Sequence, residues 1–175
     1  MEKTYNISIF TENTIGMLSR LSLIFTRRHV NIESISASPS EIEGVHRYTI
    51  VVNVTLDQVQ KLVGQIEKQI EVLKAFFHLD EEVVYQEIAL YKIPTSMLSK
   101  EGGTETILRE HNARIITIET EFTIIEKTGH SLDIKNLFDA LKPFNLLEFV
   151  SSGRVAISKP MKTLETHLEE LKTIN

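Results

Sequence analysis

The residues that could do chemistry in this chain gather in one short stretch, "TENTIG", at residues 11–16. Asn13 and Thr14 can cap the start of a helix, and the side-chain carbonyl of Asn13 could instead accept a hydrogen bond from an ammonium group. Gly16 would let a ligand approach the backbone closely, because it has no Cβ. The unpaired N–H groups of a helix N-terminus suit a carboxylate. Together these groups are typical of a site for a free amino acid.

Apolar side chains accompany this turn, as an aliphatic amino acid would require. Ile15, Met17 and Ile32 are available as the wall of a dry pocket. A second interpretation stays open on the residues alone, because short motifs also occur by chance. In that interpretation the turn is an ordinary helix cap that tolerates a glycine.

Signatures of catalysis and of metal binding are missing from the sequence. The six histidines include no pair at metal-ligand spacing, and the chain has no nucleophile elbow, P-loop or dinucleotide-binding glycine pattern. Glu110 and Asp139 could be imagined as a general acid and base, but no pattern brings a carboxylate pair into one pocket. The sequence therefore predicts no catalytic residues and no metal site.

Composition excludes further classes of partner. The chain has 175 residues, of which 42% are hydrophobic, which suits one ordinary domain or two small ones. Its net charge of −5 gives no general attraction to nucleic acid or to anionic membranes. It has no cysteine, no basic and apolar leader, and no apolar run long enough to span a bilayer. We expect a cytoplasmic protein.

The elements that must position the turn follow the order strand, helix, strand, strand, helix, strand. Alternating apolar residues predict the strands, and apolar spacings of three and four predict the helices. The expected elements are a strand at 5–9, a helix from about 15 to 28 with Leu18, Leu21 and Phe25 on its apolar face, strands at 30–38 and 46–54, a helix with Val59, Leu62, Ile66 and Ile70 in register, and a strand at 71–79 with Leu73, Ala75, Phe77 and Leu79 on one face. This order predicts a ferredoxin-like βαββαβ domain.

The same order begins again after the acidic residues 80–82. It gives a strand at 86–93, a helix at 104–112, a hairpin at 113–129, a helix at 131–141 and closing strands at 146–152 or 153–158. We therefore expect an α+β protein with two ferredoxin-like domains in tandem, at residues 1–80 and 81–159. Residues 160–175 would form a helical tail with a narrow apolar stripe, which could pack on its own domain or contact a partner.

The first half resembles a known family. The segments "ENTIGMLSR", "FTRRHVNIESI" and "HRYTIVV" are similar to the N-terminal ACT domain of the regulatory small subunit of acetolactate synthase. The segments "EIALYKI", "ARIITI" and "SGRVAIS" resemble the C-terminal domain of the same family, although Ser151 and the glycine pair at 102–103 depart from its pattern.

The resemblance implies a regulatory protein that is not itself an enzyme. Such a subunit binds the catalytic large subunit, raises its activity and confers feedback inhibition by valine or other branched-chain amino acids. Thiamine diphosphate, magnesium and FAD would belong to that partner, and the chain itself would hold no cofactor. The ACT domains would pair into a homodimer with the effector at their interface. Carried over by motif, the effector-binding residues would be Asn13, Thr14, Ile15, Gly16, Met17, Leu18, Asn31 and Ile32, with Asn31 supplied by the neighbouring domain.

An alternative function belongs to another class. A stand-alone ACT-domain sensor that controls a different enzyme or a transcription factor would carry the same turn. Co-purification with a catalytic subunit separates the two hypotheses.

Overall fold

The computed structural model describes residues 1–98 and 103–160. The chain divides into two compact units, which are residues 1–85 together with the segment that begins at Arg154, and residues 86–153. The tail expected at 160–175 lies outside the described residues except for Pro160. No helix in the described part of the chain is both long and apolar enough to cross a membrane.

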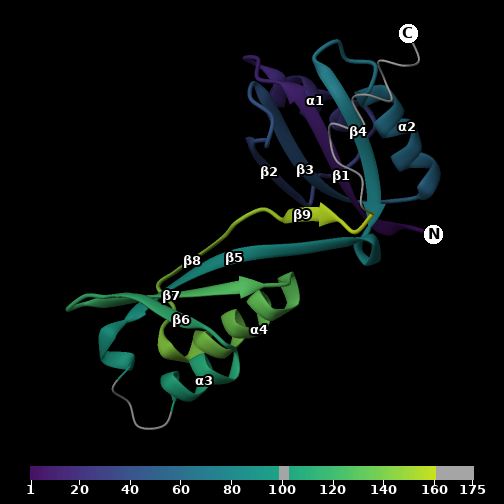
Figure 1. The fold of residues 1–175 in the computed structure, drawn as a ribbon. Helices are drawn as coiled ribbons and strands as arrows, with labels where there is room; N and C mark the ends of the chain where they lie inside the picture. Colours follow the sequence, from purple (N-terminus) through teal and green to yellow (C-terminus); the bar gives the residue numbers. More distant parts are fainter. Residues whose placement is uncertain (99–102, 161–175) are drawn as a thin grey trace. The chain divides into compact units, whose positions relative to one another are not determined.

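The first unit is a four-stranded antiparallel sheet with two helices on one face (Figure 1). Its strands lie in the order β2-β3-β1-β4. The elements are β1 (Lys3–Glu12), α1 (Met17–Arg27), β2 (Ser34–Pro39), β3 (Val45–Val54), α2 (Leu56–Ile66) and β4 (Val72–Leu79). This arrangement confirms the predicted ferredoxin-like fold of the first half.

Hydrophobic periodicity located most of the first core. The alternating apolar residues of β3, which are Tyr48, Ile50, Val52 and Val54, are all buried, as are Leu21 and Phe25 of α1. Leu18 is half exposed instead, because α1 turns Met17 and Ile24 toward the sheet. The prediction for α1 was therefore wrong at Leu18, which leaves that side chain available at the surface.

Two further predictions failed near the end of this unit. α2 ends at Ile66, so Ile70 is not on the helix and is 96% exposed. Leu73 does not share a face with Ala75 in the main core, because the pairing of β1 with β4 shifts between Phe10 and Thr11. The shift turns Val72 into the main core and leaves Leu73 against the smaller apolar cluster on the other face.

The second unit repeats the fold. Its strands lie in the order β6-β7-β5-β8, and both helices contribute to one core cluster. The elements are β5 (Val83–Pro94), α3 (Thr104–Glu110), β6 (Arg114–Ile118), β7 (Phe122–Gly129), α4 (Ser131–Leu141) and β8 (Glu148–Ser151), with the short 3-10 helices η2 (Thr95–Met97) and η3 (Lys142–Phe144). A third 3-10 helix, η1 (Asp80–Glu82), precedes β5 and lies in the first unit. Both candidate closing segments form strands, since β9 (Val155–Ser158) also pairs with β5.

Glu126 gives the second unit an acid-sensitive contribution to its stability. Its buried carboxylate accepts hydrogen bonds from Thr128 and from Arg114, and these contacts lower its pKa. A lowered pKa stabilises the fold above the unfolded value of about 4.3, and the contribution disappears as the pH falls through the folded value. Glu126→Gln should therefore flatten the loss of stability in acid, measured by hydrogen exchange of the β7 amides between pH 3 and 7. Glu148→Gln is the control, since the Glu148 side chain is exposed, and identical pH profiles for the two variants would contradict the assignment.

Candidate functional site

The predicted turn joins the end of β1 to the start of α1. Its backbone is fixed by three hydrogen bonds, from Asn13 N to Gly44 O at 3.1 Å, from Thr14 N to Glu12 O at 3.0 Å and from Met17 N to Thr14 O at 3.4 Å. Gly16 has φ of 83°, in the left-handed region that glycine adopts most easily. A Cβ at Gly16 would meet no atom within 4 Å, so the turn is open on that side. The positive φ therefore favours glycine at this position, and the absence of a Cβ leaves space in front of the turn.

The start of α1 has no side-chain cap. Gly16 itself is the N-cap residue, so the prediction that Asn13 or Thr14 caps the helix was wrong. α2 provides a comparison within the same unit, because Thr55 and Gln58 form a complete capping box there. Met17 N–H donates to the Thr14 carbonyl, but the first-turn N–H groups that follow it have no side-chain cap, and they lie at the positive end of the helix dipole. An anion is the natural acceptor for them.

Thr14 adds an unsatisfied polar atom to this turn. Its Oγ1 is buried and has no hydrogen-bond partner in the part of the chain that the structure describes. A buried hydroxyl without a partner costs about 1–3 kcal/mol. This observation is independent of the missing cap and indicates that the turn is not fully satisfied by the fold of a single chain.

Arg20 and Glu71 hold the turn from the side of the helix. The Arg20 guanidinium pairs with the Glu71 carboxylate and also donates to the carbonyl of Ile15 at 3.4 Å. The Glu71 carbonyl accepts the Glu12 N–H at 2.9 Å. Arg20 lies on the exposed side of α1, and the pattern of apolar residues does not predict these contacts. Arg20 lies one helical turn after Gly16, so the sequence could have predicted that its side chain lies on the same side of the helix as the turn.

The apolar residues predicted to line the site differ in how far their side chains are exposed. Ile15 is fully exposed and Leu18 is half exposed, so both could contact a ligand or a second chain. Met17 is only 1% exposed and belongs to the core cluster. Ile32 is partly buried against that cluster. The surface beside the turn is therefore formed by Ile15 and Leu18.

Asn31 and Ile32 lie at the other end of the sheet from the turn. They precede β2, whose first residue, Ser34, pairs with Val51, and Val51 pairs in turn with Asn6. The turn instead follows Glu12, six residues further along β1, which corresponds to roughly 20 Å of strand. The side chain of Asn31 donates to Glu33 at 2.9 Å. One chain alone therefore does not bring the two groups of predicted site residues together.

Other candidate chemistry is not supported. The Asp139 carboxylate accepts hydrogen bonds from Lys142 and Lys135, which lower its pKa, so it is a poor proton donor. The described residues contain no group of three or more histidine, aspartate or glutamate side chains that could hold a metal ion.

Comparison with known proteins identifies the family. A family model for the AHAS small subunit-like ACT domain matches residues 7–74, and one for the small subunit of acetolactate synthase matches residues 86–160. The acetolactate synthase small subunit of Bacillus subtilis is 33% identical over 87% of this chain and 89% of its own length. The chain belongs to the acetolactate synthase small subunit family.

Further members of the small subunit family are similar to this chain along nearly its whole length. The acetolactate synthase small subunit of Mycobacterium bovis is 30% identical over 94% of this chain and 97% of its own length. The crystal structure of the small subunit from Thermotoga maritima superposes with a TM-score of 0.80, at 26% identity, covering 91% of this chain and 99% of that one. All the predicted effector residues fall within the segment matched as an ACT domain.

Proposed function

We propose that this chain is a regulatory subunit without catalytic activity, which binds the catalytic large subunit of acetolactate synthase and raises its activity. Valine or another branched-chain amino acid binds the first unit and inhibits the assembly, so the chain serves feedback control of branched-chain amino-acid biosynthesis. The observation that carries the proposal is the start of α1, which has Gly16 at positive φ and no side-chain cap. Membership of the small subunit family supports it.

The proposed ligand uses three features of the turn. Its carboxylate accepts hydrogen bonds from the first-turn N–H groups of α1, which lack a side-chain cap. Its ammonium group donates to the side chain of Asn13, which is free of any capping role. Its aliphatic side chain packs against Ile15 and Leu18, and burial of these exposed residues contributes to binding.

Two copies of the chain complete the proposed site. β2 is an edge strand of the first sheet, and its last residue, Pro39, pairs with His46, which also pairs with Thr11 next to the turn. If two copies pair antiparallel through β2, the start of β2 in one copy comes beside the end of β2 in the other. Asn31 and Ile32 of one copy then approach the turn of its neighbour. We therefore propose a homodimer with the effector between two first units.

A thermal-unfolding screen against the twenty amino acids tests the binding proposal. A ligand at about 100 times its Kd should add roughly 2.7 kcal/mol to the free energy of unfolding. We expect shifts for valine and its branched relatives only, and their order ranks the effectors, since one methylene in a pocket is worth about 1–3 kcal/mol. No shift with any amino acid, for the chain alone and with the large subunit, would contradict the proposal.

Co-purification with the large subunit tests the partner. We expect a stable complex that forms acetolactate faster than the large subunit alone. A chain that binds valine but neither binds nor activates the large subunit would instead be a stand-alone sensor.

A further inference from the structure

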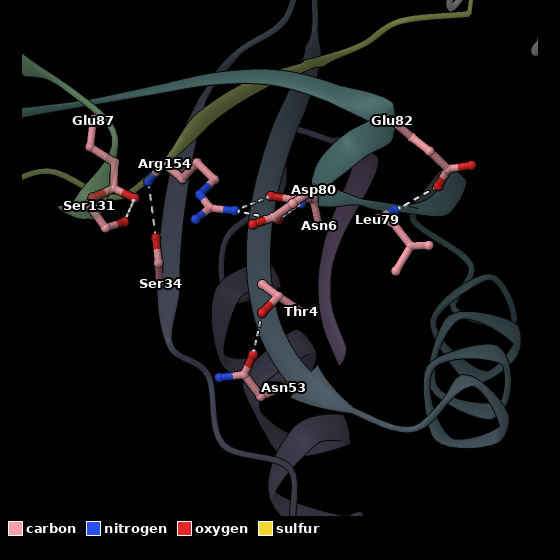
Figure 2. Close-up of polar contacts among 10 residues, drawn as sticks. All are labelled: Thr4, Asn6, Ser34, Asn53, Leu79, Asp80, Glu82, Glu87, Ser131 and Arg154. Carbon is pink, nitrogen blue, oxygen red and sulfur yellow. Dashed lines mark hydrogen bonds and ion pairs between the residues drawn. The ribbon is translucent and has the colours of Figure 1, made fainter. Parts of the chain in front are cut away.

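The segment that follows the second unit returns to the first unit and is held there by a buried arginine. Arg154 is only 6% exposed. Its Nη1 donates to Asp80 Oδ1 at 2.8 Å and to Asn6 Oδ1 at 3.0 Å, while Asn6 Nδ2 donates to the same Asp80 oxygen at 2.7 Å (Figure 2). The guanidinium also stacks over Tyr85, 3.6 Å from the ring centroid.

Besides the pairing of β9 with β5, the backbone of this return segment, residues 154–159, is bound at three further points. The Arg154 N–H donates to Ser34 Oγ at 3.0 Å (Figure 2). Arg47 Nη2 donates to the carbonyl of Ala156 at 2.6 Å, and Lys159 N donates to Glu82 O at 2.9 Å. The segment is therefore fixed to β2, β3 and η1 of the first unit.

The bond to Ser34 connects this segment with the proposed effector site. Ser34 begins β2 and lies two residues after Ile32, so any movement of Asn31 and Ile32 on binding an effector reaches it along about 7 Å of backbone. On the other side of the bond, Arg154 directly follows Gly153, the last residue of the second unit. One hydrogen bond thus joins the start of β2, just after the proposed effector residues Asn31 and Ile32, to the chain that leaves the second unit.

The burial of Arg154 indicates a positional role. Removing a guanidinium from water is costly, and a buried ion pair often stabilises a fold no more than apolar residues of the same size would. Two planar acceptors and an aromatic ring instead define one orientation for it, because the guanidinium is rigid and binds in a fixed geometry. Fixing the guanidinium also restricts the main chain of Arg154, and this places its N–H within hydrogen-bond distance of Ser34 Oγ.

We propose that Ser34 and Arg154 are positioning residues that couple the effector site to the second unit. An effector that shifts the start of β2 displaces the Arg154 N–H, and the return segment passes the change to the second unit. The proposal rests on the proposed function, because it requires an effector at Asn31 and Ile32. It concerns the transmission of binding and not the binding itself.

The test measures binding and its transmission separately in the full-length protein. The Kd of valine is determined by calorimetry for the subunit alone and for its complex with the large subunit, and the ratio of the two is the coupling factor. Ser34→Ala removes the acceptor of the Arg154 N–H and is expected to move that ratio toward 1 by about 2- to 30-fold, with little change in Kd for the subunit alone. Ser36→Ala, two residues along the same strand, is the matched control and should keep the wild-type ratio.

Arg154→Lys is a second variant that acts on the other side of the contact. Lysine keeps the positive charge but loses the planar geometry toward Asp80 and Asn6. It should therefore also move the coupling factor toward 1. An unchanged factor in both variants would overturn the inference and leave the proposed function standing. Loss of valine binding to the isolated Ser34→Ala subunit would also overturn it, since Ser34 would then belong to the binding site. Absence of valine binding by the wild type would refute the proposed function itself.

Discussion

A Gly16→Asp subunit is expected to lose valine inhibition while it still activates the large subunit. The new carboxylate would stand at the start of α1, where the carboxylate of the ligand is proposed to bind. Like charges placed together at a binding site cost several kcal/mol, and each 1.4 kcal/mol corresponds to a tenfold change in Kd. We therefore expect valine to bind at least about 10-fold more weakly. Activation should persist, because the substitution lies in the turn and leaves both cores intact.

Gly16→Asn is the matched control for this experiment. Asparagine has nearly the same size and shape as aspartate but no charge, and both residues tolerate the left-handed backbone conformation better than most. No atom lies within 4 Å of the position of a Cβ at Gly16, so neither variant should clash within the chain. The measurements are the Kd of valine by calorimetry and the rate of acetolactate formation with and without valine. If both variants lose valine binding equally, the cause is backbone strain or side-chain bulk and not charge. Full valine inhibition of a folded Gly16→Asp protein would exclude the site.

The sequence predicted the elements of both units because their cores follow the two basic periods of secondary structure. Val59, Leu62 and Ile66 of α2 are all buried, as expected for a helix with one apolar face. Leu73 was misplaced because a shift of register inverts the faces of a strand without any change in its composition. Ile70 was misplaced because an apolar residue in phase with a helix does not show where the helix ends.

The turn could be found from the sequence, but its geometry could not. Asn13 and Thr14 are good capping residues by type, yet the helix begins later, at Met17, with the glycine as its N-cap. Residue preferences do not specify which of several neighbouring residues starts the helix. The separation of Asn31 from the turn is likewise a property of the sheet register, and it becomes visible only when the strands are paired.

The contacts of Arg154 could not be predicted from any local pattern. In the sequence, Asn6 is one of the alternating residues of a strand and Asp80 is part of an acidic turn. Arg154 lies 148 residues after Asn6, so no local pattern connects them. Hydrophobic periodicity does not report on polar contacts of this separation. A buried polar network is recognised only from burial and hydrogen-bond geometry.

Asp80→Asn is expected to destabilise the first unit strongly. The substitution keeps the oxygen that accepts from Asn6 but removes the charge opposite Arg154, whose side chain is 7% exposed. An unpaired buried charge costs about 3–5 kcal/mol, and because the Asp80 side chain is 40% exposed, water can partly replace it. We therefore expect a loss of about 2–3 kcal/mol, measured by hydrogen exchange of the β1 amides, which reports the free energy of unfolding of the first unit. Asp57→Asn, which breaks an exposed pair with Lys61, should change little.

The double variant Asp80→Asn with Arg154→Met gives the decisive comparison. If the penalty arises from an uncompensated guanidinium, replacing that group with an apolar side chain of similar length should recover part of the lost stability. The double variant would then be more stable than Asp80→Asn alone, although it lacks one more polar contact. If Arg154 served mainly through packing on Tyr85 and its hydrogen bond to Asn6, the two losses would add instead. Recovery of stability in the double variant would show that Asp80 is needed mainly to compensate the buried charge of Arg154, the residue that holds the return segment.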